Sequence, residues 1–160
     1  MTQKGMAIDV AHLKRVALFE GLIPDHARLV AGIVEEQTVE PGTTIFKDGE
    51  VADRFYFIIN GRVRISKQIP GMGEEALAIL MPGEYFGEMA LVDDSPRSAD
   101  AITNTTVLLG SIPRAAFEEL LFMHKDLAHD MLWTFTRTLS ARLRESNEKI
   151  RAFLMMAGKF

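Results

Sequence analysis

The residues of this chain that are best suited to chemistry lie between Gly87 and Ser98. Arg97 carries a planar cationic fork that matches a phosphate group. Gly87 lets a ligand approach the backbone closely, and Ser98 adds a hydroxyl and an N–H group. A short helical turn over residues 88–92 would present its free N–H groups to the same anion. The chemistry predicted here is therefore the binding of an anion rather than the making or breaking of bonds.

Glu88 places a carboxylate in the same stretch, where it would repel a bound anion. Its presence makes sense if the ligand also carries a hydrogen-bond donor, such as a sugar hydroxyl. An anion next to a hydroxyl describes a nucleotide. The alternative is that Glu88 and Arg97 form an ordinary surface ion pair, which contributes little to stability. Spacing alone leaves both interpretations open.

Short β-rich runs must position these residues, because they occupy most of the chain from Thr38 to Leu109. Turn dipeptides separate the runs, and Asn60-Gly61 between two apolar runs predicts a β-hairpin. Such regular punctuation is typical of an all-β sandwich or barrel. The strands that we predict cover residues 43–46, 54–59, 62–67, 75–81 and 105–109.

Helical patterns flank the β region on both sides. Apolar residues at helical spacing predict a helix over residues 8–20 and a second over 26–34. Pro113 is typical of a helix start and predicts a helix over 114–122, followed by a long helical tract over 125–153. The architecture expected from the sequence is helices, then an antiparallel β-roll, then helices.

Composition limits the classes of protein to consider. A chain of 160 residues is enough for one domain, and its net charge of −4 gives no general reason to bind nucleic acid. The absence of cysteine excludes disulfides, thiolate nucleophiles, iron–sulfur clusters and cysteine-bound zinc. We find no apolar signal core and no run of membrane-spanning length. We therefore expect a cytoplasmic protein with no membrane contact.

Enzyme classes fit the sequence poorly. A cupin-like metal enzyme needs histidine and carboxylate ligands on its strands, whereas all four histidines lie outside the predicted strands. We find no nucleophile elbow or Ser–His–Asp order, and no axial ligand for a haem in the β region. We therefore expect no catalytic residue, no metal and no cofactor.

The stretch FGEMAL followed by PRSADA, residues 86–101, resembles the phosphate-binding cassette of the cyclic nucleotide-binding domain family. LFEGL, PGTTIFKDGEVADRFYFIINGRVRI and MPGEYFGE resemble the same family's β-roll in order and spacing, so the likeness covers residues 10–150. It implies an α+β fold, with a jelly-roll-like antiparallel β-roll (a double-stranded β-helix) between N-terminal helices and a long C-terminal helix. The implied segments of this single domain are 1–36, 37–112 and 113–160.

The resemblance also implies a role for each matching residue. Glu88 would accept a hydrogen bond from the ribose 2′-hydroxyl, and Arg97 would pair with the cyclic phosphate. Family members that have lost the Glu or the Arg no longer bind, and this chain keeps both. Other implied residues line the sugar, bind the phosphate or form the apolar walls of the pocket: Gly87, Met89, Ala90, Ser98, Ile65 and Leu77.

The C-terminal helix carries a second pattern. Its apolar positions Leu139, Leu143, Ile150 and Phe153, with Ser146 between them, follow the spacing of a coiled-coil seam. The helix could pack on its own β-roll, or it could pair with its copy in a homodimer. The clustered cations Arg137, Arg142, Arg144, Lys149 and Arg151 are interpreted as the solvated face of the helix.

The segment LRESNEKI resembles the long helix of the transcription-factor branch of the family, which implies that Ser146 and Asn147 touch the base. This favours adenine, although Ser98 could also serve cyclic GMP. In that branch a helix-turn-helix module follows, whereas this sequence stops at Phe160. We expect no DNA-binding module, so the chain acts on an unknown effector or is part of a longer protein.

The function expected from the sequence is a sensor of cyclic AMP or cyclic GMP whose C-terminal helices move on binding. The alternative is a non-binding member of the family that serves as a dimerisation or scaffold unit.

Overall fold

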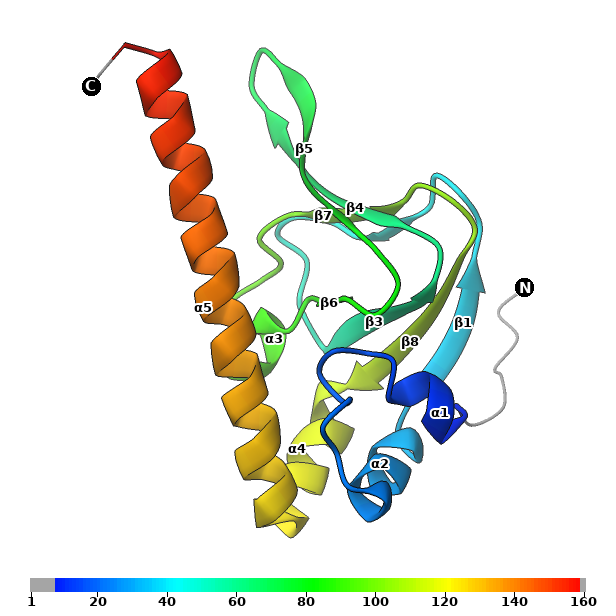
Figure 1. Ribbon diagram of the computed structural model, residues 1–160. Coiled ribbons are helices and arrows are strands. Elements are labelled where there is room, and N and C mark those ends of the chain that lie inside the picture. Colours follow the sequence, from blue (N-terminus) through cyan, green and yellow to red (C-terminus); the bar gives the residue numbers. More distant parts are fainter. Residues whose placement is uncertain (1–7, 159–160) are drawn as a thin grey trace.

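A computed structural model describes residues 8–158, so residues 1–7 and 159–160 of the predicted segments lie outside the described part. Two four-stranded antiparallel sheets form the centre of the molecule (Figure 1). One sheet has the order β1 (Glu35–Val39), β8 (Val107–Pro113), β3 (Arg54–Asn60) and β6 (Tyr85–Phe86). The other has the order β2 (Thr44–Phe46), β7 (Asp100–Thr103), β4 (Val63–Ile69) and β5 (Gly73–Leu80). The predicted β-roll is confirmed.

The turn at Asn60-Gly61 does not form the hairpin that we predicted. β3 pairs with β6 and β8, whereas β4 pairs with β5 and β7, so the chain crosses here from one sheet to the other. Gly61 has a φ of 89°, and a Cβ there would lie 2.4 Å from the carbonyl oxygen of Thr106. The Asn-Gly signal marked the turn correctly, but it did not specify which strands pair.

The N-terminal helical region is shorter than predicted. α1 covers only Val10–Leu13 instead of residues 8–20. Beyond it the chain continues in turns, because the Ala17 N–H donates to the carbonyl of Gly83 at 3.0 Å rather than to its own helix. The apolar side chains of this segment still enter the core. α2 (Pro24–Ala31) lies close to its predicted position.

The helices after the β-roll agree with the sequence. α4 covers Arg114–Met123 and begins after Pro113, and α5 covers Lys125–Met156. Three short strands, β1, β6 and β7, were not predicted. They carry few apolar residues or are only two to five residues long, so they lack a periodic signal.

The core consists of two buried clusters. One lies between the sheets and contains Tyr56, Ile58 and Phe86. The other joins the first sheet to the helices, where Phe55 packs edge-to-face on Phe117 and Phe135, with ring centroids 5.3 and 5.9 Å away. The second cluster fixes α4 and the first half of α5 to the sheet.

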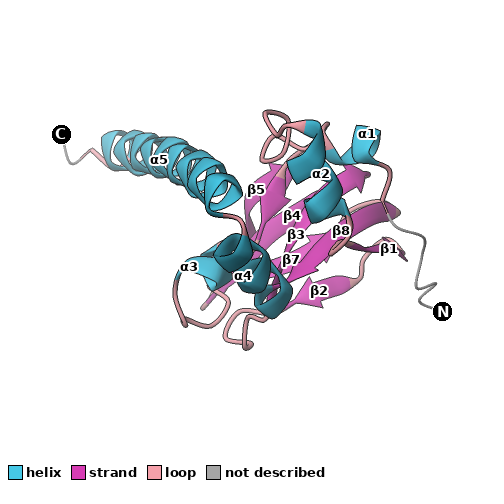
Figure 2. Cartoon of the chain, turned by 90° about the horizontal axis from the view of Figure 1, so that it is seen from below, coloured by secondary structure: helices cyan, strands magenta, loops and turns pink. Residues whose placement is uncertain are grey.

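The two halves of α5 differ in their surroundings. Leu127, Met131 and Phe135 in the first half are buried, whereas no residue after Phe135 in α5 is fully buried. The C-terminal half projects past the sheets (Figure 2). Among the described helices, none is both long and apolar enough to cross a membrane.

A glycine inside the first sheet generates a stability prediction. A Cβ at Gly110 would lie 2.1 Å from the Phe57 ring, which is fully buried against Phe19. We expect Gly110→Ala to lower the free energy of unfolding by about 1–3 kcal/mol, because the core must shift to admit a methyl group. Urea denaturation measures the change. Gly21→Ala is the control, since nothing lies within 4 Å of its added Cβ. Equal midpoints for the two variants would contradict this packing.

Candidate functional site

The stretch from Phe86 to Ala101, called the cassette below, connects the two sheets. It leaves the first sheet at β6, passes through the short helix α3 (Met89–Val92) and enters the second sheet at β7. Gly87 begins the turn with a φ of 75°. A Cβ at Gly87 would lie 2.7 Å from Nη1 of Arg97. Both the backbone conformation and this close approach therefore favour glycine.

Arg97 occupies the centre of the cassette and is only 6% exposed. Its Nη1 donates to the carbonyl of Gly87 at 3.1 Å, and its Nη2 donates to the carbonyl of Arg54 at 2.6 Å. The guanidinium also lies over the ring of Phe46, 4.1 Å from the centroid. Its Nε is buried and has no hydrogen-bond partner among the described residues.

The charge of Arg97 is not balanced by a direct ion pair within the described part of the chain. Burial lowers the pKa of the Arg97 guanidinium, and its interactions with Tyr56, Asp53 and Glu50 oppose this only in part. A buried cation is unfavourable unless an anion compensates it. The site is therefore electrostatically prepared for an anionic group.

Glu88 lies at the start of α3 and is 2% exposed. Its carboxylate forms an ion pair with Arg142 of α5, which also donates to the carbonyl of Tyr85. The Arg142 guanidinium lies 5.1 Å from the centroid of the Tyr85 ring. The interpretation of Arg142 as part of a solvated helix face was therefore wrong.

A sequence signal for Arg142 existed but was ambiguous. Arg142 follows the buried Phe135 by two helical turns, so both project from one face of α5. The predicted seam at Leu139 and Leu143 lies on a neighbouring face, and only the folded structure shows which face meets the cassette. Arg144, two residues further, is exposed.

The remaining predicted pocket residues have varied surroundings. Ile65 of β4 is partly buried. Leu77 is the residue of β5 without a partner where the register between β4 and β5 shifts, and its side chain is 48% exposed. Ser98 is exposed, and its carbonyl accepts a hydrogen bond from Nζ of Lys67 at 3.2 Å. Met89 is exposed at the start of α3, and Ala90 follows it in the same helix.

The structure does not join Ser146 and Asn147 to the cassette. Both are exposed on α5, one turn beyond Arg142, and neither side chain has a hydrogen bond to a described cassette residue. At this level the helix approaches β5 instead, where Nζ of Lys149 donates to the carbonyl of Leu77 at 3.4 Å. Their contact with a base stays a prediction.

The site is thus a cassette between two sheets of a β-roll, with a buried arginine that has no ion pair among the described residues. Comparison with known proteins identifies the class of protein, because the model of the cyclic nucleotide-binding domain matches residues 36–124. The chain belongs to the cyclic nucleotide-binding domain family.

Three relatives illustrate the breadth of this family. The CRP-like cAMP-activated global transcriptional regulator of Mycobacterium tuberculosis is 31% identical over 86% of this chain and 60% of its own length. The cAMP-dependent protein kinase regulatory subunit of Colletotrichum orbiculare is 34% identical over 68% of this chain and 27% of its own length. The N-terminal domain of a transcriptional regulator from Streptomyces coelicolor is a similar solved structure, with a TM-score of 0.72 and 30% identity. It matches over 89% of this chain and 95% of that one.

These relatives are regulators rather than enzymes. The chain spans 60% of the mycobacterial regulator and 27% of the kinase subunit, so it corresponds to one part of each.

The ion pair between Glu88 and Arg142 can be tested by removing one partner. We expect Arg142→Met to lower the free energy of unfolding by about 1–3 kcal/mol, because it leaves a buried carboxylate unpaired. Arg144→Met is the matched control on the exposed face and should change stability by less than about 0.5 kcal/mol.

The double variant Glu88→Gln/Arg142→Met should recover much of the loss, since no uncompensated charge remains. Chemical denaturation of the wild type, Glu88→Gln, Arg142→Met and the double variant completes the cycle. Simple additivity of the two single changes would show that the two side chains do not interact.

Proposed function

We propose that this chain is a sensor domain that binds a cyclic nucleotide and transmits its presence through α5. The observation that carries this proposal is Arg97, a buried cation with an unpartnered Nε and no ion pair among the described residues. A cyclic phosphate carries one negative charge and acceptor oxygens. It would supply both the missing charge and the missing acceptor.

Glu88 supports a nucleotide rather than a simple anion. Its carboxylate can accept more hydrogen bonds than the ion pair with Arg142 uses, because two oxygens offer about four acceptor positions. A ribose 2′-hydroxyl can therefore donate to Glu88 while Arg142 stays in place. Gly87, Met89, Ala90 and Ser98 then lie along the sugar and phosphate, with Ile65 and Leu77 toward the base.

Cyclic AMP is the ligand that we favour. The mycobacterial regulator and the fungal kinase subunit are both named for cAMP. In our proposal Ser146 and Asn147 reach the adenine after α5 shifts toward the cassette. Cyclic GMP is the competing ligand, for which the exposed Ser98 offers a hydroxyl.

Signalling follows from the link between the cassette and α5. Arg142 connects that helix to Glu88, and Phe135 anchors it beside Phe117 of α4. A ligand at Arg97 and Glu88 therefore acts on the contacts that fix both helices. The response is a shift between two positions of α5, and its size is limited by the ligand's differential affinity for the two positions.

The exposed half of α5 is proposed as the surface of a homodimer. Leu143, Ile150 and Phe153 are 63%, 55% and 66% exposed and recur at coiled-coil spacing. A second copy of the same helix would cover this seam. In this proposal the relative position of the two α5 helices in the dimer controls the downstream effector. The scaffold alternative uses the same seam without a nucleotide.

Calorimetric titration with cyclic AMP, cyclic GMP and linear AMP tests the ligand. We expect one cyclic nucleotide to bind at micromolar concentration or tighter. Arg97→Lys should weaken it at least about tenfold because a point charge cannot make the forked contact. Arg97→Ala should abolish measurable binding.

Thermal unfolding of both variants separates lost binding from lost folding, and Arg144→Ala serves as the control for charge. An absence of heat with either cyclic nucleotide, in folded protein free of co-purified nucleotide, would favour the scaffold alternative.

Sedimentation equilibrium tests the proposed dimer. We expect Leu143→Glu/Ile150→Glu to dissociate the wild-type dimer, because it places four carboxylates in one apolar seam. Glu145→Gln/Glu148→Gln, on the polar side of the same helix turns, should leave the dimer intact. A monomeric wild-type protein at high concentration, with and without cyclic AMP, would exclude this interface.

A further inference from the structure

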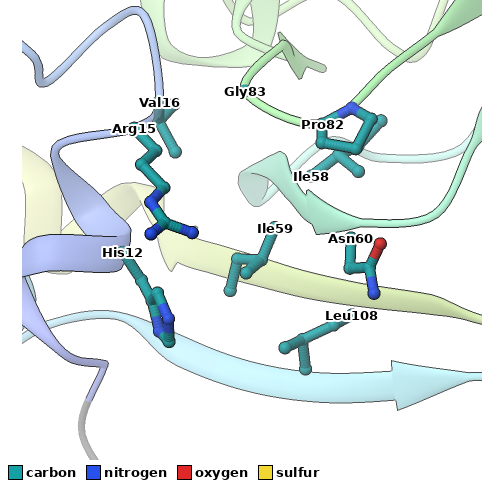
Figure 3. A pocket seen from close by; sticks show the side chains of 9 residues that line it. All are labelled: His12, Arg15, Val16, Ile58, Ile59, Asn60, Pro82, Gly83 and Leu108. Atoms are coloured by element: carbon teal, nitrogen blue, oxygen red, sulfur yellow. The ribbon is translucent and has the colours of Figure 1, made fainter.

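A groove lies at the end of β3 that is remote from Arg97. Its first part is a hollow of about 490 Å³ between the N-terminal turns and the sheet, and its second part is a neighbouring hollow of about 480 Å³. Asn60 and Pro82 line both hollows and so join them. Figure 3 shows His12 and Arg15 on one side of the first hollow, Asn60 and Pro82 on the other, and Ile59 between them.

The floor of the groove is apolar and is formed by residues of the core. Ile58 and Val16 are buried beneath it, and Leu108 is partly exposed beside them. The register of β3 on β8 shifts between Ile58 and Asn60, which makes Ile59 an extra, bulged residue. Such bulges re-aim a side chain and leave its backbone without a cross-strand partner. The groove therefore offers apolar contacts that include the side chain of a bulged residue.

The wall of the groove is also fixed in place. The Ala17 N–H donates to the carbonyl of Gly83 at 3.0 Å, so the turn that carries Arg15 is tied to the loop that carries Pro82. Glu84 follows in this loop, but its carboxylate accepts a hydrogen bond from the Met81 N–H at 2.7 Å. Glu84 does not line either hollow.

The charge of the groove is entirely basic. His12 and Arg15 line the first hollow and Arg62 lines the second, and no carboxylate lines either one. None of these three side chains has an ion pair or hydrogen bond within the described residues. By contrast, four other arginines on the roll and its flanking helices each pair with a carboxylate: Arg28, Arg54, Arg64 and Arg114. The two unpaired arginines beside an apolar floor select an acidic, partly apolar occupant.

We propose that this groove binds an extended acidic peptide segment of a partner protein. An extended peptide offers side chains on alternate sides, so one set can face the apolar floor while the other faces the basic side chains. An apolar side chain would pack against Ile59 and Leu108, and flanking carboxylates would meet Arg15 and Arg62. Two joined hollows suit a linear segment better than one compact ligand. The proposal does not depend on nucleotide binding.

The test is a selection of random short linear peptides displayed on phage, made on the wild-type chain without added nucleotide. We expect enrichment of sequences that alternate acidic and apolar residues. The enriched peptides should bind Arg15→Glu/Arg62→Glu at least about tenfold more weakly, since attraction becomes repulsion. Arg137→Glu/Arg144→Glu changes charge equally at two exposed sites on α5 and should bind them like the wild type.

Both variants alter exposed side chains, and circular dichroism confirms that each is folded. NMR titration of the labelled wild-type chain should then place the largest amide shift changes at Ile59, Asn60 and Arg62. Three results would overturn the proposal. They are no enrichment, enriched peptides without acidic residues, and peptides whose affinity is unchanged in Arg15→Glu/Arg62→Glu.

Discussion

The burial of one guanidinium organises the candidate site. Arg97 lies outside the strands and ties its part of the cassette to the ends of two of them, since its side chain bonds the carbonyls of Gly87 after β6 and Arg54 at the start of β3. Its backbone N–H and carbonyl meet Glu50 and Gly49. The cassette, β3 and the loop before it are therefore held around a single charge. The Arg97 guanidinium is held in place by hydrogen bonds to two backbone carbonyls. Among the described residues, however, no carboxylate forms an ion pair with it, so its positive charge is not balanced.

α5 combines two kinds of helix surface in one continuous element. Its first half belongs to the core through Leu127, Met131 and Phe135, and Arg142 marks its last contact with the cassette. Beyond that point the apolar residues face solvent. The interpretation of a helix packed on its own roll therefore holds for the first half of α5, while pairing of the second half with its copy in a homodimer stays a prediction. The buried half and the exposed half of α5 meet near Arg142, which contacts Glu88 of the candidate site.

The sequence allowed the fold class to be predicted because turn residues and apolar runs are local signals. Strand partners are not local, and the Asn60-Gly61 turn led us to pair β3 with β4, although they lie in different sheets. The helix predicted over residues 8–20 is shorter in the structure, because the N–H of Ala17 donates to the carbonyl of Gly83 instead of to a carbonyl of its own segment. At the site, Glu88 and Arg97 could be singled out by type and spacing. Arg142 could not, because its role depends on which face of α5 meets the roll.

The length of α5 has a mechanical consequence. A helix rises about 1.5 Å per residue, so the segment from Phe135 to Met156 forms a rigid arm of about 30 Å beyond its last buried anchor. A tilt of about ten degrees at the anchor would carry the far end through about 5 Å, given that length. Under such a tilt, a displacement near Arg142 of less than the length of a side chain would correspond, at the tip, to about the spacing between helical turns.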